Sequence, residues 1–166
     1  MVVHNRYDMD ARVKNYVAAL RSVGIDVDVL CPRDGRHPSQ WKSDDGANVF
    51  TIKTRHNQRH RLVGYLLEYG IAFFQYGALL TCLFFSNRYR LIHVHNMPDF
   101  IVFASVVPRL FGAKLILDIH DPMPEFYLSK SNHIAGAVMA RLLKIEERIS
   151  VVLADAVVTA NPLFKR

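Results

Sequence analysis

The sequence predicts an α/β domain built on a doubly wound parallel sheet of about six strands. Short apolar segments of strand length alternate along the chain with longer helical segments. The clearest unit is 90–125, where two strand-like segments, each ending in a histidine and a polar turn, flank an apolar helix. A strand–helix–strand order implies a right-handed crossover and a parallel strand pair. The 166 residues, about half of them apolar, suit a single domain over 1–166.

The first half of the chain supplies three of the strands. They are expected at Met1–His4, Ile25–Leu30 and Asn48–Thr54. Helical spacing predicts a helix over Arg12–Val23, with Asp10 as its N-cap and Gly24 as its C-terminal stop, and one apolar face made of Val13, Tyr16, Val17 and Leu20. The segment 33–47 is rich in Asp, Gly, Ser and Pro, and we expect it to be a loop.

The second half supplies three more strands and two helices beyond the apolar one described below. The strands are expected at Leu91–His95, Lys114–His120 and Ala156–Thr159. One helix starts near Pro98, which suits a first helical turn, and ends at Gly112. The second helix spans Ile134–Leu153. Its apolar residues Val138, Leu142, Ile145 and Ile149 share one side, and Arg141, Lys144, Glu147 and Arg148 are expected to face water.

The least ordinary segment is Leu62–Phe85, which is nearly all apolar. It is long enough to span a bilayer, but a crossing would separate strands that belong to one sheet. We predict one helix, or two broken near Gly70 or Gly77, whose surplus apolar face and flanking bases meet an anionic membrane or a partner. The alternative is a long core helix in a larger assembly. The residues expected to face the membrane are Arg59, Arg61, Tyr69, Phe73, Phe74, Phe84, Phe85 and Arg88.

Charge and missing motifs narrow the function classes. The formal charge of +6 favours anionic partners, although no recognised nucleic-acid module appears and no nucleic-acid partner is expected. The chain has no G-x-G-x-x-G, Walker lysine or G-x-S-x-G motif, which counts against a dehydrogenase, an NTPase and an α/β-hydrolase. The two cysteines form no disulfide framework, and no signal peptide is visible, so we expect a cytoplasmic protein.

Histidines at the carboxyl ends of two strands are the first candidates for chemistry. His93 and His95 share one face of their strand and would make two zinc ligands, but no recognisable spacing places a third. We therefore predict no metal, with His93 in the core and His95 at the edge of the sheet. Asp118 and His120 also share a face. Asp118 either orients the imidazole of His120 or hydrogen-bonds a neighbouring loop, and His120 is the stronger functional candidate.

Polar residues after three of the strands complete the candidate binding site, because ligands of parallel α/β sheets collect at the carboxyl ends of the strands. The turn after the first strand also opens a helix, whose backbone N–H groups favour an anion. The substrate-binding candidates are Asn5, Arg6 and Arg12 after the first strand, His95, Asn96 and Asp99 after the fourth, and Asp121 and Glu125 after the fifth.

Four segments resemble the N-terminal domain of family 4 glycosyltransferases, retaining enzymes of the GT-B type with two Rossmann-like domains, and especially the bacterial branch that builds surface polysaccharides. They are V-V-H-N-R-Y-D-M-D-A-R-V at 2–13, H-V-H-N-M-P-D-F at 93–100, G-A-K-L-I-L-D-I-H-D-P-M-P-E at 112–125 and A-D-A-V-V-T-A-N at 154–161. The resemblance implies one half of a GT-B fold. It also implies hexosyl transfer from a nucleoside-diphosphate sugar, with retained configuration and no cofactor or essential metal.

The same resemblance assigns roles to parts of the chain. The N-terminal domain holds the acceptor, often a lipid-linked one, and His120 is expected to reach the donor sugar as the catalytic residue. The family's donor-binding C-terminal domain, with its E-x7-E motif, has no counterpart in 1–166. We therefore expect the chain to be inactive without such a domain or partner subunit. The first turn also lacks the glycine pair that many relatives carry.

Two other functions stay open from the sequence. One is a non-catalytic Rossmann-like interaction module that docks on a membrane or on a partner transferase. The other is a flavodoxin-like ligand-binding domain, although nothing in the sequence marks a flavin site. In the transferase interpretation the protein is peripheral on the inner face of the plasma membrane. Its acceptor and its donor sugar are not specified by the sequence.

Overall fold

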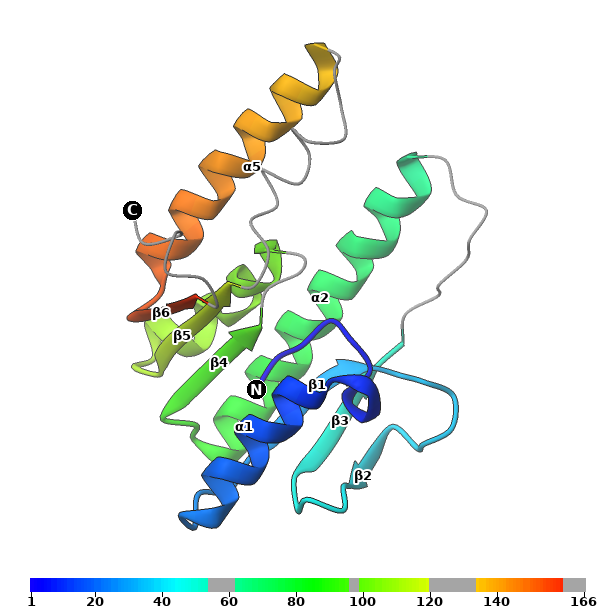
Figure 1. Ribbon diagram of the computed structural model, residues 1–166, viewed down its shortest axis with the longest axis vertical. Helices are drawn as coiled ribbons and strands as arrows, with labels where there is room; N and C mark the ends of the chain where they lie inside the picture. The colour runs from blue at the N-terminus through cyan, green and yellow to red at the C-terminus, as the bar shows by residue number, and fades with distance from the viewer. Residues whose placement is uncertain (54–61, 96–98, 120–133, 160–166) are drawn as a thin grey trace.

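The computed structural model describes the backbone of residues 1–53, 62–95, 99–119 and 134–159 (Figure 1), and within these ranges the side chains of 62–66, 99 and 134–139 are left aside. The strands are β1 (Asp28–Pro32), β2 (Gln40–Lys42), β3 (Asn48–Ile52), β4 (Leu91–His95), β5 (Lys114–Ile119) and β6 (Ala156–Thr159). The helices are η1 (Tyr7–Met9), α1 (Ala11–Ser22), α2 (Leu62–Asn87), η2 (Asp99–Ser105), α3 (Val106–Leu110) and α5 (Ile134–Leu153). Thus strands and helices alternate over much of the chain, as an α/β fold requires.

The N-terminal segment joins two three-stranded groups, ordered β2-β3-β1 and β4-β5-β6, into one sheet. Val2 forms parallel bridges to Leu30 of β1 and Val94 of β4. Its N–H donates to the His93 carbonyl at 2.8 Å, and its carbonyl accepts from the His95 N–H at 2.9 Å. The strand order therefore reverses at Val2, and all neighbours except β2 and β3 pair in parallel. This confirms the predicted Rossmann-like, doubly wound α/β fold, one half of a GT-B architecture.

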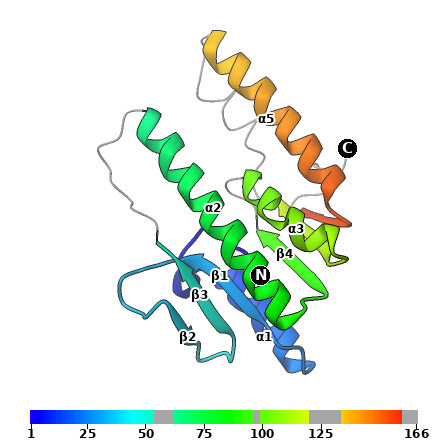
Figure 2. The same ribbon diagram turned by 180° about the vertical axis from the view of Figure 1, so that it is seen from behind.

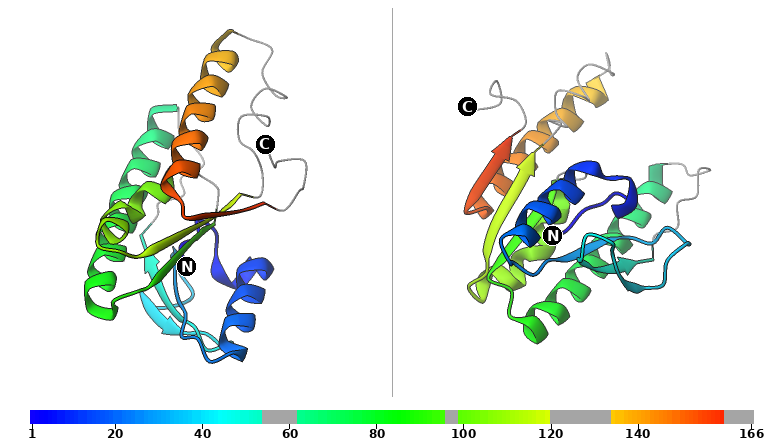
Figure 3. Two further views of the ribbon diagram at one scale, coloured as in Figure 1. Left: turned by 90° about the vertical axis from the view of Figure 1, so that its left-hand side faces the viewer. Right: turned by 60° about the horizontal axis from the view of Figure 1, so that its bottom comes forward.

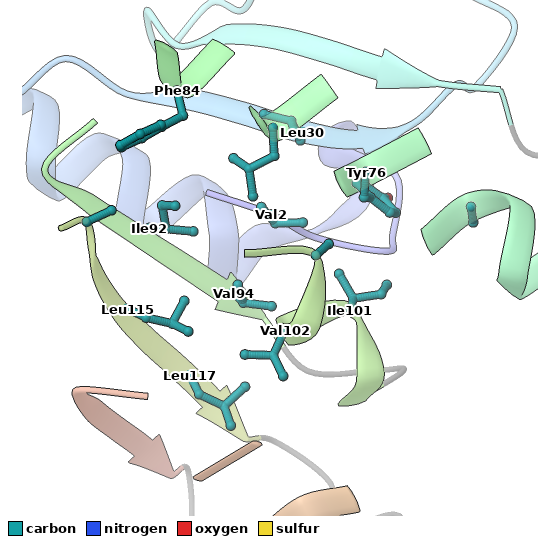
Figure 4. Packing of buried hydrophobic residues seen from close by; sticks show 14 of the residues in the cluster. Val2, Leu30, Tyr76, Phe84, Ile92, Val94, Ile101, Val102, Leu115 and Leu117 are labelled. Atoms are coloured by element: carbon teal, nitrogen blue, oxygen red, sulfur yellow. The ribbon is translucent and has the colours of Figure 1, made fainter. Parts of the chain in front are cut away.

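The helices cover the two faces of this sheet unequally. Figure 3 shows α1 on one face, and α2, α3 and α5 on the other. Figure 2 shows α2 lying across the sheet with α3 beside it. Side chains of β4 point to both faces of the sheet. Ile92 and Val94 join the core cluster on the α2 side, and the residues next to them point to the opposite face because successive side chains of a strand alternate. Figure 4 shows that core, with the strand side chains meeting Tyr76 of α2 and Ile101 and Val102 of η2.

Local signals placed the first helix correctly. The Asp10 carboxylate accepts a hydrogen bond from the Val13 N–H at 3.1 Å, which is the predicted N-cap. Gly24 follows the helix with a φ of 81°, a conformation that glycine adopts without strain. The next strand begins at Asp28, three residues later than predicted, and it extends to Pro32.

The expectation of a loop over 33–47 is wrong in one place, because β2 lies within it and pairs antiparallel with β3. Trp41 provides the physical reason. Its ring stacks on His37 at a centroid distance of 4.1 Å and meets Tyr7 edge-on at 6.1 Å. One half-buried aromatic residue thus anchors a strand that the polar composition around it did not predict.

Helix α2 is a single helix that continues through Gly70 and Gly77, so neither glycine breaks it. Its inner side places Ala72, Tyr76, Leu80 and Phe84 in the core. Phe84 is only 8 % exposed, so its predicted place on the membrane-facing side is wrong. The four-residue spacing of this inner stripe is what a helix lying along a sheet requires.

The outer side of α2 retains part of the predicted apolar face. Leu67, Ile71, Phe74 and Phe85 are all more than half exposed. Tyr69 and Phe73 are half-buried, because both pack against Phe100 of η2 at centroid distances of 5.9 and 6.1 Å. Of the predicted basic residues, Arg88 is exposed, whereas Arg59 and Arg61 lie outside the described residues.

Helix α5 departs from the expected orientation. Its residues Leu142, Ile145, Ile149 and Val152 are between 52 and 83 % exposed, and buried positions include Ala140 and Ser150. The half-buried carboxylate of Glu146 has a raised pKa because of burial. The predicted apolar side therefore faces outward at Leu142, Ile145 and Ile149, while Arg141, Lys144 and Arg148 are exposed as expected.

One hydrogen bond ties α2 to the central strand, and its loss should be measurable. The hydroxyl of Tyr76, which is fully buried, donates to the Val3 carbonyl at 2.9 Å. We expect Tyr76→Phe to lower the free energy of unfolding by about 1–3 kcal/mol, because the buried carbonyl loses its donor. Urea unfolding measures the change. The matched control is Tyr16→Phe, since the Tyr16 hydroxyl makes no hydrogen bond within the described part of the chain. Equal stability of the two variants would contradict this role for Tyr76.

Candidate functional site

The reversal of strand order marks a place for a ligand. From Val2 the chain turns into η1 and α1 on one face, whereas from β4 it continues to η2 on the other. Two neighbouring strands whose connections leave on opposite faces open a crevice at their carboxyl ends. The carboxyl ends of Val2 and β4 therefore define the expected binding edge of this sheet.

A cluster of three polar side chains lies at this edge, buried beneath α1. His93 and His95 come from β4, and Asp118 comes from β5, where it stands directly opposite His95 in the register. His95 Nδ1 lies 3.1 Å from Asp118 Oδ2, and His93 Nε2 lies 3.9 Å from the same oxygen. His95 and Asp118 are fully buried, and His93 is 8 % exposed. A carboxylate thus lies close to two imidazoles in the interior of the domain, in hydrogen-bond contact with that of His95.

Tyr16 of α1 covers the cluster. Its ring centroid lies 5.0 Å from that of His93 and 5.6 Å from that of His95, and the two imidazoles are 4.2 Å apart. Burial and, to a lesser degree, the adjacent His95 lower the pKa of His93 to about 4, although the charge of Asp118 acts in the opposite direction. His93 is therefore neutral at neutral pH. Burial, and to a lesser degree the charge of Asp118, raises the pKa of Tyr16.

The sequence interpretation of these residues needs one correction and one addition. His95 stands at the carboxyl end of its strand as expected, but it is fully enclosed and not at an open edge. Asp118 contacts His95 across the sheet, a pairing absent from the two roles predicted for it. The available signal was positional, because both residues lie near the carboxyl ends of predicted neighbouring strands. Tyr16 was expected only as an apolar face residue of its helix.

The turn after the first strand holds its arginines in ion pairs. Arg6 contacts Asp8 at 2.7 Å and Asp34 at 3.7 Å, and Arg12 contacts Asp10 at 3.6 Å. The exposed Asn5 accepts a hydrogen bond from the Arg6 N–H. Each cation is only about one-third exposed and already faces a carboxylate. An anion at this turn would therefore compete with these carboxylates for the arginines.

The remaining predicted site residues follow β4 and β5 in the sequence. Asn96, His120, Asp121 and Glu125 lie outside the described residues, and Asp99 is described only as the first residue of η2. His120 follows β5 directly, and Asn96 follows β4. In the sequence, Asn96 is adjacent to His95, and His120 comes two residues after Asp118.

A second polar feature lies at the amino ends of β4 and β5. A hollow of about 600 Å³ is lined by Phe84, Phe85, Arg88, Tyr89, Arg90, Phe111, Gly112, Ala113 and Lys114. The Phe85 and Phe111 rings meet edge-on at 5.2 Å, and both residues are more than half exposed. Three cations and two exposed aromatic rings therefore adjoin the C-terminal end of α2.

Comparison with known families agrees with this architecture. The sequence profile described as "Glycosyl transferase 4-like domain" matches residues 9–166, nearly the whole chain. The chain belongs to this family. Membership identifies it as a glycosyltransferase domain and supports transferase activity in general. No curated protein is similar enough to the chain to count as a match.

Proposed function

We propose that this family 4-like chain is the N-terminal, acceptor-side domain of a bacterial retaining glycosyltransferase. It would help to move a hexosyl group from a nucleoside-diphosphate sugar to a lipid-linked or saccharide acceptor in surface polysaccharide synthesis. The observation that carries the proposal is the family match over a single sheet whose strand order reverses at Val2. Such a sheet supplies one crevice, and the crevice lies at the carboxyl ends of Val2 and β4.

The residues around that crevice suit a sugar acceptor. Hydroxyl groups are recognised by carboxylate, amide and imidazole groups that donate or accept hydrogen bonds. Asn5, Asn96, Asp99, Asp121 and Glu125 all follow strands or turns at this edge and are proposed as acceptor contacts. Arg6 and Arg12 are proposed to bind phosphate by exchanging their carboxylate partners for it. His95 is fully enclosed. It is therefore proposed to support the floor of the crevice through its contact with Asp118.

His120 is proposed as the residue that reaches the donor sugar. It is the first residue after β5, and Asp118, two residues earlier, is held by its contact with His95. A fixed strand end of this kind limits where the next residues can begin. The donor itself would be bound by a second Rossmann-like domain with an E-x7-E motif, on the same polypeptide or on a partner subunit. On this proposal the reaction needs no cofactor besides the nucleotide sugar.

Sugar transfer by a reconstituted pair of domains tests this proposal. We expect the chain to transfer label from a nucleoside-diphosphate sugar to a lipid-linked saccharide only when a donor-binding domain from the same family is added. His120→Ala should reduce that transfer about a hundredfold, because one transition-state contact is lost. His37→Ala, which changes a histidine between β1 and β2, is the control.

Two results would count against the proposal. Turnover by the isolated chain would contradict its role as one half of a site. Transfer that is unaffected by His120→Ala would favour the interaction module that docks on a partner transferase. Magnetic resonance of the product's anomeric proton would separately test retention of configuration.

We also propose that α2 rests on an anionic membrane surface, on the cytoplasmic face of the plasma membrane. Among the described residues, one helical segment, Leu67–Asn87, is long and apolar enough to cross a membrane by length and composition. Its inner stripe nevertheless packs on the sheet, and Tyr76 is hydrogen-bonded to the central strand. The outer stripe, with Phe74 73 % exposed, is available for shallow insertion instead.

The basic hollow at the end of α2 supports this orientation. Arg88, Arg90 and Lys114 line it beside the exposed Phe85 and Phe111. Cations next to exposed aromatic rings suit the interfacial zone, where lipid phosphates lie above the acyl chains. Contact through α2 would place the acceptor crevice near lipid-linked substrates.

Vesicle sedimentation tests the membrane contact. We expect the chain to sediment with vesicles of phosphatidylcholine and phosphatidylglycerol, and less with phosphatidylcholine alone, because the bases attract anionic head groups. Phe74→Asp should reduce binding at least fivefold, since a charge would enter the apolar zone. Val152→Asp is the matched control, because Val152 is also a strongly exposed apolar residue, on α5. Failure to bind either lipid mixture, or equal loss in both variants, would contradict the contact.

A further inference from the structure

The buried cluster beneath α1 has the composition of a metal site. One ligand atom each from His93, His95 and Asp118 lies within 4.8 Å of the others, and all three residues are buried. We propose that His93, His95 and Asp118 bind one divalent transition-metal ion, with Zn²⁺ as the first candidate. The proposal does not rest on the transferase function, because it concerns ligand atoms whose positions the structure describes.

The distances fit a single ion. Zinc binds imidazole nitrogen and carboxylate oxygen at about 2.0–2.2 Å, so ligand atoms of a tetrahedral site stand about 3.3 Å apart. The His95 Nδ1 to Asp118 Oδ2 distance is 3.1 Å, and the His93 Nε2 to Asp118 Oδ2 distance is 3.9 Å. A small side-chain adjustment of His93 would shorten its distance to Asp118 Oδ2 to that of His95. The β4–β5 register already sets His95 opposite Asp118.

The unpartnered Nε2 atom of His93 points to a missing ligand. His93 Nε2 and His95 Nε2 are buried and have no hydrogen-bond partner in the part of the chain that the structure describes. A buried polar atom without a partner costs free energy, so such atoms normally meet protein, water or an ion. Coordination would satisfy His93 Nε2 directly. His95 would bind through Nδ1, the atom that now faces Asp118.

The chemistry of the ligand set selects the class of ion. Two imidazoles and one carboxylate suit zinc and its first-row neighbours, whereas magnesium and calcium prefer oxygen ligands. Asp118 supplies negative charge. Three protein ligands leave a fourth position for a water molecule or another oxygen.

A bound ion would fasten the carboxyl ends of β4 and β5 to each other. These two strands lead directly into residues 96 and 120, where the candidate acceptor and donor contacts begin. An ion that binds only the folded chain also raises its stability by mass action. The site would therefore position the edge of the crevice while remaining apart from the reacting sugar.

Metal content of the purified full chain tests the proposal. The chain is dialysed against Zn²⁺, passed through a desalting column and analysed by plasma mass spectrometry. We expect about one zinc ion per chain, consistent with a single site. His93→Gln and Asp118→Asn should each weaken zinc affinity at least tenfold in chelator competition, because each removes a ligand. His37→Gln is the matched control. His37 Nδ1 lies 2.9 Å from an Asp34 carboxylate oxygen, but this His–Asp pair includes no second histidine.

Cobalt substitution gives a readout that does not depend on the variants. Wild-type chain loaded with Co²⁺ should show the intense visible absorption of a tetrahedral site. Added Zn²⁺ should displace the Co²⁺ and abolish this absorption. Wild-type protein that retains no stoichiometric zinc and shows no such absorption would overturn the proposal. Equal zinc affinity in His93→Gln, Asp118→Asn and His37→Gln, with each variant folded by circular dichroism, would also overturn it. Neither readout involves sugar transfer.

Discussion

Backbone pairing of the N-terminal segment with two strands is the constraint on which this structure depends. Met1–Val3 lies between β1 and β4, and its hydrogen bonds of 2.8–2.9 Å reach both. The carbonyl of Val3 also accepts a hydrogen bond from the hydroxyl of Tyr76. This bond fixes α2 to the N-terminal segment that joins the two halves of the sheet. Buried N–H and C=O groups must be paired, so a central segment of this kind holds its neighbours in register. Two small sheets thereby become one doubly wound sheet.

The same constraint determines what lies beneath α1. Because the first strand occupies the centre, β4 becomes an interior strand and both of its faces are covered. His93 and His95 alternate with apolar residues and so share the α1 face. Buried imidazoles need partners, and Asp118 supplies one from the adjacent strand. The polar cluster and the strand-order reversal are thus two consequences of one topology, and both lie at the edge proposed for the acceptor.

Helical segments illustrate how far the sequence predicts this fold. Asp10 and Gly24 act through local backbone geometry, so α1 could be placed from sequence alone. The orientation of α2 could not, because an almost wholly apolar helix carries no periodic signal for its buried side. The inward direction of Phe84 and the outward direction of Phe74 are set by the sheet and η2. Helix α5 does carry a periodic apolar side, and this side is nevertheless exposed at Leu142, Ile145 and Ile149.

The candidate site shows the same division between local and long-range information. Histidines at strand ends were visible in the sequence, and so was the expectation that ligands gather there. The His95–Asp118 contact was not, because it depends on the register between strands separated by a helix. The contact of Trp41 with Tyr7, a ring distant in sequence, was hidden for the same reason. Contacts between segments that are far apart in the chain were the part that needed the structure.

Residue-resolved hydrogen exchange tests the central claim, that the N-terminal segment unites both halves of the sheet. The amides of Val2 and His95 bond across the Val2–β4 boundary, and that of Leu30 bonds across the boundary with β1. We predict that these three amides exchange only through global unfolding, with the same free energy as the amides of β5. Rapid exchange at Val2, Leu30 and His95 while β5 remains protected would show that the segment does not hold the sheet together, and it would contradict this account.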